Sequence, residues 1–133
     1  MTATVPPPYT LAVPPFPFRA LTALAGKAPM GGARESALAV LMAARLAAGS
    51  AAPTVLPSGA RRVRADAARV WLSALALPAP VRASVLKLID TSATDDCHAV
   101  AAAVTKVTEV TATYLDRQAR LELTRLAARL SAH

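Results

Sequence analysis

The first 17 residues constrain the fold most, because they contain too many prolines to form a helix. The stretch VPPPYTLAVPPFPF, residues 5–18, holds six of the chain's eleven prolines and three of its five aromatic residues. Proline fixes its own φ and shifts the residue before it towards extended backbone. We therefore expect residues 1–17 to form an extended, proline-rich arm with polyproline II character.

The sequence after the arm is typical of helices that pack closely. The chain has 133 residues, enough for a single core, and its 54% of apolar residues are mostly alanine, valine and leucine. Apolar residues recur at three- and four-residue spacing between glycines and prolines. The predicted fold class is all-α: a helical bundle domain of about five helices over residues 18–133, the last of them long.

Glycines, prolines and capping residues delimit the expected helices. The second helix has the widest apolar coverage, so we expect it to be the most central. We expect Thr94 or Asp95 to cap the last helix. The predicted helices span residues 18–25, 33–48, 59–77, 81–89 and about 95–130.

The last predicted helix is long for a domain of this size. About 35 residues at ~1.5 Å per residue would extend over about 50 Å. Threonine and valine crowd residues 105–113, TKVTEVTAT, and both residue types disfavour helices. We expect the helix to bend, break or protrude at this segment.

Composition favours a bacterial protein of the cytoplasm. The formal net charge is +7, which suits an acidic partner, but twelve of the fifteen basic residues are arginine, as a GC-rich genome would produce whatever the function. No apolar run approaches the ~20 residues that span a bilayer, so we expect no membrane association, and no secretory signal is visible. The single Cys97 excludes an intrachain disulfide and fits a reducing compartment.

Residues suited to catalysis or metal binding do not form a recognisable pattern. Asp95–His98, DDCH, is the densest cluster, but the only other histidine is His133, so cysteine and histidine cannot build a tetrahedral zinc site within one chain. No serine lies in a G-x-S-x-G turn, and no glycine-rich loop follows a strand. We expect no enzymatic activity, no cofactor, no metal and no small-molecule substrate.

The predicted helix over residues 59–77 is amphipathic and basic. One side carries the apolar residues Val63, Ala67, Val70, Trp71 and Ala74. Clustered arginines near a helix N-terminus can contact phosphates, which makes nucleic acid a possible partner. The residues that would make these contacts are Arg61, Arg62, Arg64 and Arg69. The alternative is a solvated face on which Asp66 partly pairs with Arg62 and Arg69.

Two apolar features favour a protein partner. Burying each aromatic side chain of residues 5–18 is worth roughly 1.5–3 kcal/mol, so we expect the arm to dock on the chain's own helices or on another chain. A leucine stripe along the end of the last helix can pair with another copy if that helix extends beyond the body. The predicted partner-contacting residues are Tyr9, Phe16, Phe18, Leu115, Leu123, Leu126 and Leu130.

These observations predict a non-catalytic protein–protein interaction module. It would be a small adaptor or accessory subunit of a larger bacterial assembly, or a homo-oligomer. The alternative is a basic nucleic-acid-binding regulator that uses the arginine-rich helix over residues 59–77.

Overall fold

The computed structural model describes residues 18–27, 32–50 and 58–132. These residues form helices joined by short turns and contain no strand, which confirms the predicted all-α class. The predicted arm, residues 1–17, lies outside the described residues. The described helices are α1 (Arg19–Lys27), α2 (Gly32–Gly49), α3 (Ser58–Leu72), α4 (Ala79–Ser92), α5 (Cys97–Val110) and α6 (Arg117–Ser131).

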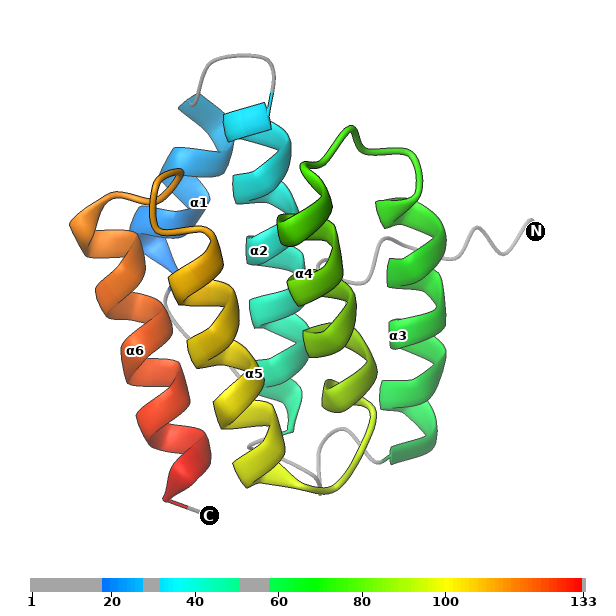
Figure 1. Cartoon of the computed structure of the whole chain (residues 1–133). Coiled ribbons are helices and arrows are strands. Elements are labelled where there is room, and N and C mark those ends of the chain that lie inside the picture. The colour runs from blue at the N-terminus through cyan, green and yellow to red at the C-terminus, as the bar shows by residue number, and fades with distance from the viewer. Residues whose placement is uncertain (1–17, 28–31, 51–57, 133) are drawn as a thin grey trace.

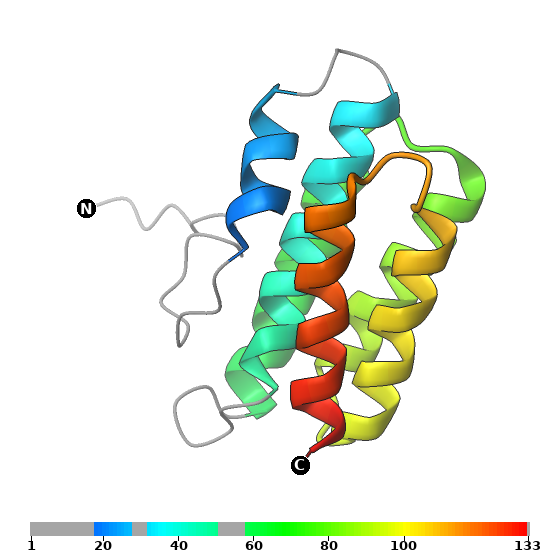
Figure 2. The ribbon, with the colours of Figure 1, turned by 90° about the vertical axis from the view of Figure 1, so that its left-hand side faces the viewer.

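The helices form two layers. Figure 1 shows α6, α5, α4 and α3 side by side in one row, and each is in contact with the next. Helices α1 and α2 pack against the back of this row, as the turned view in Figure 2 shows. At one end of the row, α3 contacts only α2 and α4 among the described helices.

Helix α2 is the central element, as its apolar coverage predicts. It contacts every other described helix. Between Ser36 and Ser50 every residue except Leu38 and Arg45 is buried, and nearly half of the residues in this stretch are alanine. The small side chains let the surrounding helices approach α2 closely, so that packing density is kept without large residues.

The expected long C-terminal helix is instead two helices, and the described part of the chain has six helices rather than about five. The chain leaves the helix at Thr111, inside the segment rich in threonine and valine, and re-enters one at Arg117. The Thr111 hydroxyl donates to the carbonyl of Val107, 2.6 Å away, and the Asp116 carboxylate accepts from the backbone N–H of Ala119 at 2.8 Å. Capped at both sides of this break, α6 folds back along α5 (Figure 1).

Helix α4 is longer at both ends than the expected 81–89, and two other helix ends differ from those expected because of side-chain hydrogen bonds. Helix α3 ends at Leu72 instead of residue 77, and the guanidinium of Arg82 donates to the carbonyls of Leu72 and Leu75 at 3.4 and 2.5 Å. Helix α5 is capped by Asp96, whose carboxylate accepts from the N–H of Ala99, rather than by a residue before it. Both differences arise because a terminal carbonyl or N–H group finds a side-chain partner at that position.

Helix α1 is fixed by a carboxylate from the other end of the chain. Glu122 on α6 is buried, and its two oxygens accept hydrogen bonds from the backbone N–H groups of Ala20 and Leu21 at 2.7 and 2.9 Å. These N–H groups lie in the first turn of α1, where a helix has no partners of its own. A negative charge at this end also suits the helix dipole.

Candidate protein-interaction surface

Helix α3 buries arginines and exposes valines. Arg61 and Arg64 are only 3% and 2% exposed, whereas Val63 and Val70 are 64% and 74% exposed. The inward side of α3 also contains Ala65, Ala68 and Leu72. The amphipathic pattern would ordinarily turn the valines inward.

Arg61 is buried because it links α3 to the turn before α5. Its guanidinium donates to the carbonyl of Thr94 at 2.6 Å and forms an ion pair with Asp95, whose side chain stays exposed. Long aliphatic stems allow arginine to cross apolar surface and place its charge at the edge. Burial lowers the pKa of Arg64 from its ordinary value.

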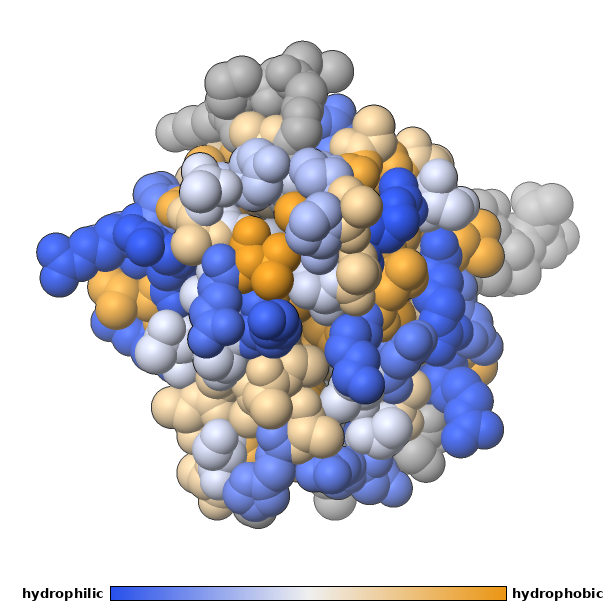
Figure 3. All heavy atoms as spheres, in the orientation of Figure 1, coloured by the Kyte–Doolittle hydropathy of each residue, from blue (hydrophilic) through white to orange (hydrophobic). Residues whose placement is uncertain are grey.

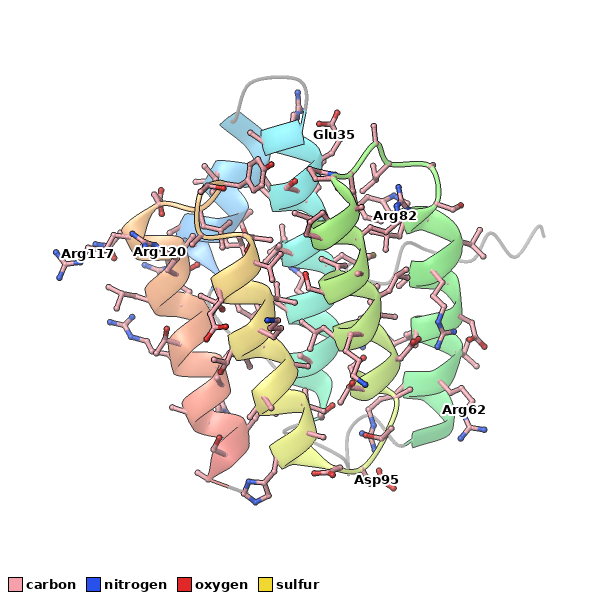
Figure 4. The ribbon with its side chains drawn as sticks, viewed as in Figure 1. Glu35, Arg62, Arg82, Asp95, Arg117 and Arg120 are labelled. Atoms are coloured by element: carbon pink, nitrogen blue, oxygen red, sulfur yellow. The ribbon has the colours of Figure 1, made fainter. Side chains whose placement is uncertain are left out.

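The predicted phosphate-contacting residues do not form one exposed cluster. Arg69 forms ion pairs with Asp66 and Asp90, and the hydrogen bond that it donates to the Asp90 carboxylate is the main reason that its pKa is raised. With Arg61 and Arg64 buried and Arg69 partly buried, Arg62 is the one exposed member of the predicted set, and Figure 4 shows it directed away from the bundle. The predicted pairing of Asp66 with Arg69 is present.

The predicted partner-contacting residues of the last helix lie in the core. Leu115 is 5% exposed, and Leu123, Leu126 and Leu130 are 0% exposed. The leucine stripe holds α6 on the rest of the bundle, because the break after α5 brings α6 back against the body instead of letting it protrude. Phe18 is likewise 4% exposed, and Tyr9 and Phe16 lie outside the described residues.

A different apolar surface is exposed, on α3. Its outward residues recur at spacings of three, four and three, and Figure 3 shows hydrophobic residues reaching the surface over α3. Trp71 is half-buried beside them. The sequence places Val63, Ala67 and Val70 on one side of this helix but does not show which way that side faces. The outward stripe, called the α3 stripe below, consists of the exposed Val63 and Val70 and the half-buried Ala60 and Ala67.

Helix α6 carries four of the eight exposed basic residues in the described part of the chain. Figure 4 shows Arg117 and Arg120 pointing outward from α6, and Arg125 and Arg129 are also exposed. Glu122, the only acidic residue in α6, is turned into the core. The sequence alone does not single out these arginines, because nothing local shows that the one acid of the helix is buried.

A groove of about 360 Å³ lies between α5 and α6. Three threonine hydroxyls line it, and all of them donate to carbonyls of their own helices. Glu109 and Arg120 also line it, and the rest of its wall is formed by apolar side chains. No nucleophile with an adjacent base lies in the described groove, so its geometry supports no specific reaction.

The Asp95–His98 cluster is used for local structure. Asp96 caps α5, and the Cys97 thiol donates to the carbonyl of Ser50 at 3.4 Å. Within residues 18–27, 32–50 and 58–132, no three His, Cys, Asp or Glu side chains come together as a metal site.

No family model matches this chain, and comparisons with curated proteins and with solved structures found no match. None of the helices in the described part of the chain has the length and apolar character needed to cross a membrane.

Proposed function

We propose that this chain is a non-catalytic protein–protein interaction module, an adaptor or accessory subunit that binds through the outer side of α3. The observation that carries the proposal is the α3 stripe, in which Val63 and Val70 are 64% and 74% exposed in a bundle whose other large apolar residues are buried or half-buried wherever they are described. Exposed apolar patches bordered by polar residues mark interaction sites on proteins of this size.

The border of the stripe supports binding of a folded partner. Arg62 and Asp66 lie beside it on α3, and Arg69 is held in place by Asp66 and Asp90. An apolar centre with a polar, charge-balanced rim is the usual arrangement of an interface. The arm residues Tyr9 and Phe16 remain candidates for additional contacts, and the cytoplasmic location and bacterial origin remain predictions.

Nucleic-acid binding through α3 is the weaker proposal. Arg61 and Arg64 are buried and Arg69 is paired with two carboxylates, so this helix offers phosphates little unpaired charge. Electrostatic binding to DNA scales with the number of phosphates that the protein neutralises.

The test is reconstitution of a complex from purified chains. Proteins retained by the tagged full chain from its native cells are purified and mixed with it, and the mass of the complex is measured by native mass spectrometry. We expect a complex of fixed stoichiometry that Val63→Glu/Val70→Glu weakens at least ~100-fold, because two charges would enter an apolar contact.

The matched control is Ala102→Glu/Ala128→Glu, which adds the same charge at exposed positions of α5 and α6. This variant should bind as the unchanged chain does. Equal loss with both variants, or no complex of fixed stoichiometry with any partner or with itself, would contradict the proposed function.

A further inference from the structure

The α3 stripe has the spacing of a helix–helix seam. Residues at alternating steps of three and four return to the same side of a helix after every seven residues, and this is the pattern that packs against a second helix. The stripe covers four positions over 11 residues, from Ala60 to Val70. Helix α3 already uses its other side to contact α2 and α4, so the seam is additional to the packing of the bundle.

We propose, on the basis of the interaction function above, that the partner of this stripe is α3 of a second copy, arranged antiparallel about a two-fold axis. A two-fold contact uses the same patch on both chains, so the patch must complement itself. The α3 stripe meets this requirement in shape and in charge.

Shape complementarity follows from the alternation of small and larger residues. The seam has two alternating kinds of position, one occupied by Ala60 and Ala67 and the other by Val63 and Val70. In an antiparallel pair each kind faces the other kind, whereas in a parallel pair each faces its own kind. With Ala67 opposite Val63 of the other copy, Val70 lies opposite Ala60, so each valine faces an alanine and all four positions lie within α3. A parallel pair would place valine on valine and alanine on alanine, which alternates crowded and empty layers.

Charge complementarity favours the same arrangement. The border that contains Arg62, Asp66 and Arg69 faces the identical border of the other copy in an antiparallel pair. Asp66 then lies about two residues, ~3 Å along the helix axis, from the level of the other copy's Arg62. Together with Asp90, which pairs with Arg69, the four side chains at this border have no net charge. Two chains of formal charge +7 can therefore meet at α3 without bringing like charges together. A contact through α6 would instead place exposed arginines of both copies against each other.

The size of the contact predicts its strength. Helix α3 has 15 residues, about 22 Å at 1.5 Å per residue. A single pair of such helices with alanine and valine at the contact buries less than the ~1,200 Å² typical of a stable interface. We expect a dimer with a dissociation constant on the order of micromolar or weaker, so its population depends on concentration.

Sedimentation velocity of the full chain between about 1 µM and about 1 mM tests the pairing. The mass should rise from that of one chain, 13.7 kDa, towards twice that value. Val63→Glu/Val70→Glu should stay monomeric throughout, with unchanged circular dichroism because both positions are exposed, and Ala102→Glu/Ala128→Glu should dimerise as the unchanged chain does. A monomer at every concentration, or a dimer that survives the change at Val63 and Val70, would overturn the proposal.

Disulfide cross-linking tests the orientation in a Cys97→Ser background. A mixture of Ala60→Cys and Val70→Cys chains with tags of different size should give the mixed dimer, since these positions face each other. Val70→Cys alone should not cross-link, because its two copies would be about 10 residues, ~15 Å, apart along the axis. The opposite result indicates a parallel pair and overturns the arrangement.

Failure of self-pairing can be distinguished from failure of the proposed function. If the chain is monomeric but still forms a complex with another protein that depends on Val63 and Val70, the second-copy proposal is wrong and the interaction function stands. If neither complex forms, both are wrong.

Discussion

Glu122 shows at the residue scale how one buried side chain can position a distant helix. In the sequence it is one of several charged residues beside a leucine stripe. In the fold it accepts hydrogen bonds from the backbone N–H groups of Ala20 and Leu21, which precede it in the sequence by 102 and 101 residues. No local pattern connects the two, because the contact exists only after α6 folds back and α1 packs against it.

Replacing Glu122 should therefore destabilise the protein more than replacing an exposed glutamate. We expect Glu122→Ala to lower the free energy of unfolding by about 3 kcal/mol, since it leaves two buried N–H groups without their charged acceptor. Urea denaturation measures the change. The control is Glu109→Ala on the exposed surface of α5, which should alter stability by less than about 0.5 kcal/mol. A loss below about 1 kcal/mol for Glu122→Ala would show that the N–H groups find water or other acceptors.

The arginines of α3 show at the residue scale that two adjacent residues of the same type can have different environments. Arg61 and Arg62 are adjacent and chemically identical, yet one is 3% exposed and bonded to the turn before α5, and the other is exposed. Their roles differ because neighbouring helix positions are separated by about 100° around the axis.

At the element scale, the hairpin of α5 and α6 determines that the leucine stripe is buried. Its turn is short, from Thr111 to Asp116, and the stripe continues directly after it. A continuous helix would have exposed these leucines, but two antiparallel helices bury them against each other and against the rest of the core. The break is therefore what changes a predicted partner surface into core.

The N-cap of α6 should make a measurable contribution to this hairpin. We expect Asp116→Ala to cost about 1 kcal/mol of unfolding free energy, since it removes the acceptor for the N–H of Ala119. Asp116→Asn should cost little, because asparagine caps helices about as well. Thermal and urea unfolding of the two variants measure the difference. Equal destabilisation by both would indicate that the charge of Asp116 matters instead of its capping geometry.

Charge is distributed unevenly at the scale of the whole molecule. The sequence predicted a basic surface on the helix over residues 59–77. In the structure, exposed arginines gather instead on α6, at the opposite end of the row from α3 (Figures 1 and 4). The two ends of the row therefore suit different partners: the charge-balanced surface at α3 suits an apolar protein contact, and the positive surface at α6 suits an acidic partner.

Any affinity for nucleic acid should accordingly come from α6. We expect binding of duplex DNA at low salt to fall by on the order of tenfold or more in Arg117→Glu/Arg120→Glu, and to weaken steeply as salt rises. Arg62→Glu on α3 should have a smaller effect, since it removes one contact only. Fluorescence anisotropy over a salt series measures both. A larger effect of Arg62→Glu would return the nucleic-acid hypothesis to α3.

The all-α class, the central role of α2 and the place where the last helix breaks could be predicted from the sequence. These features depend on properties that each segment carries locally: the 3.6-residue period, the positions of glycine and proline, and the low helix preference of threonine and valine. The tertiary structure alone decided which side of α3 is buried, that the leucines of α6 belong to the core, and that Glu122 caps α1. The reason is that α3 has two sides able to pack, and only the competition among all helices for contact with α2 selects which of them remains exposed.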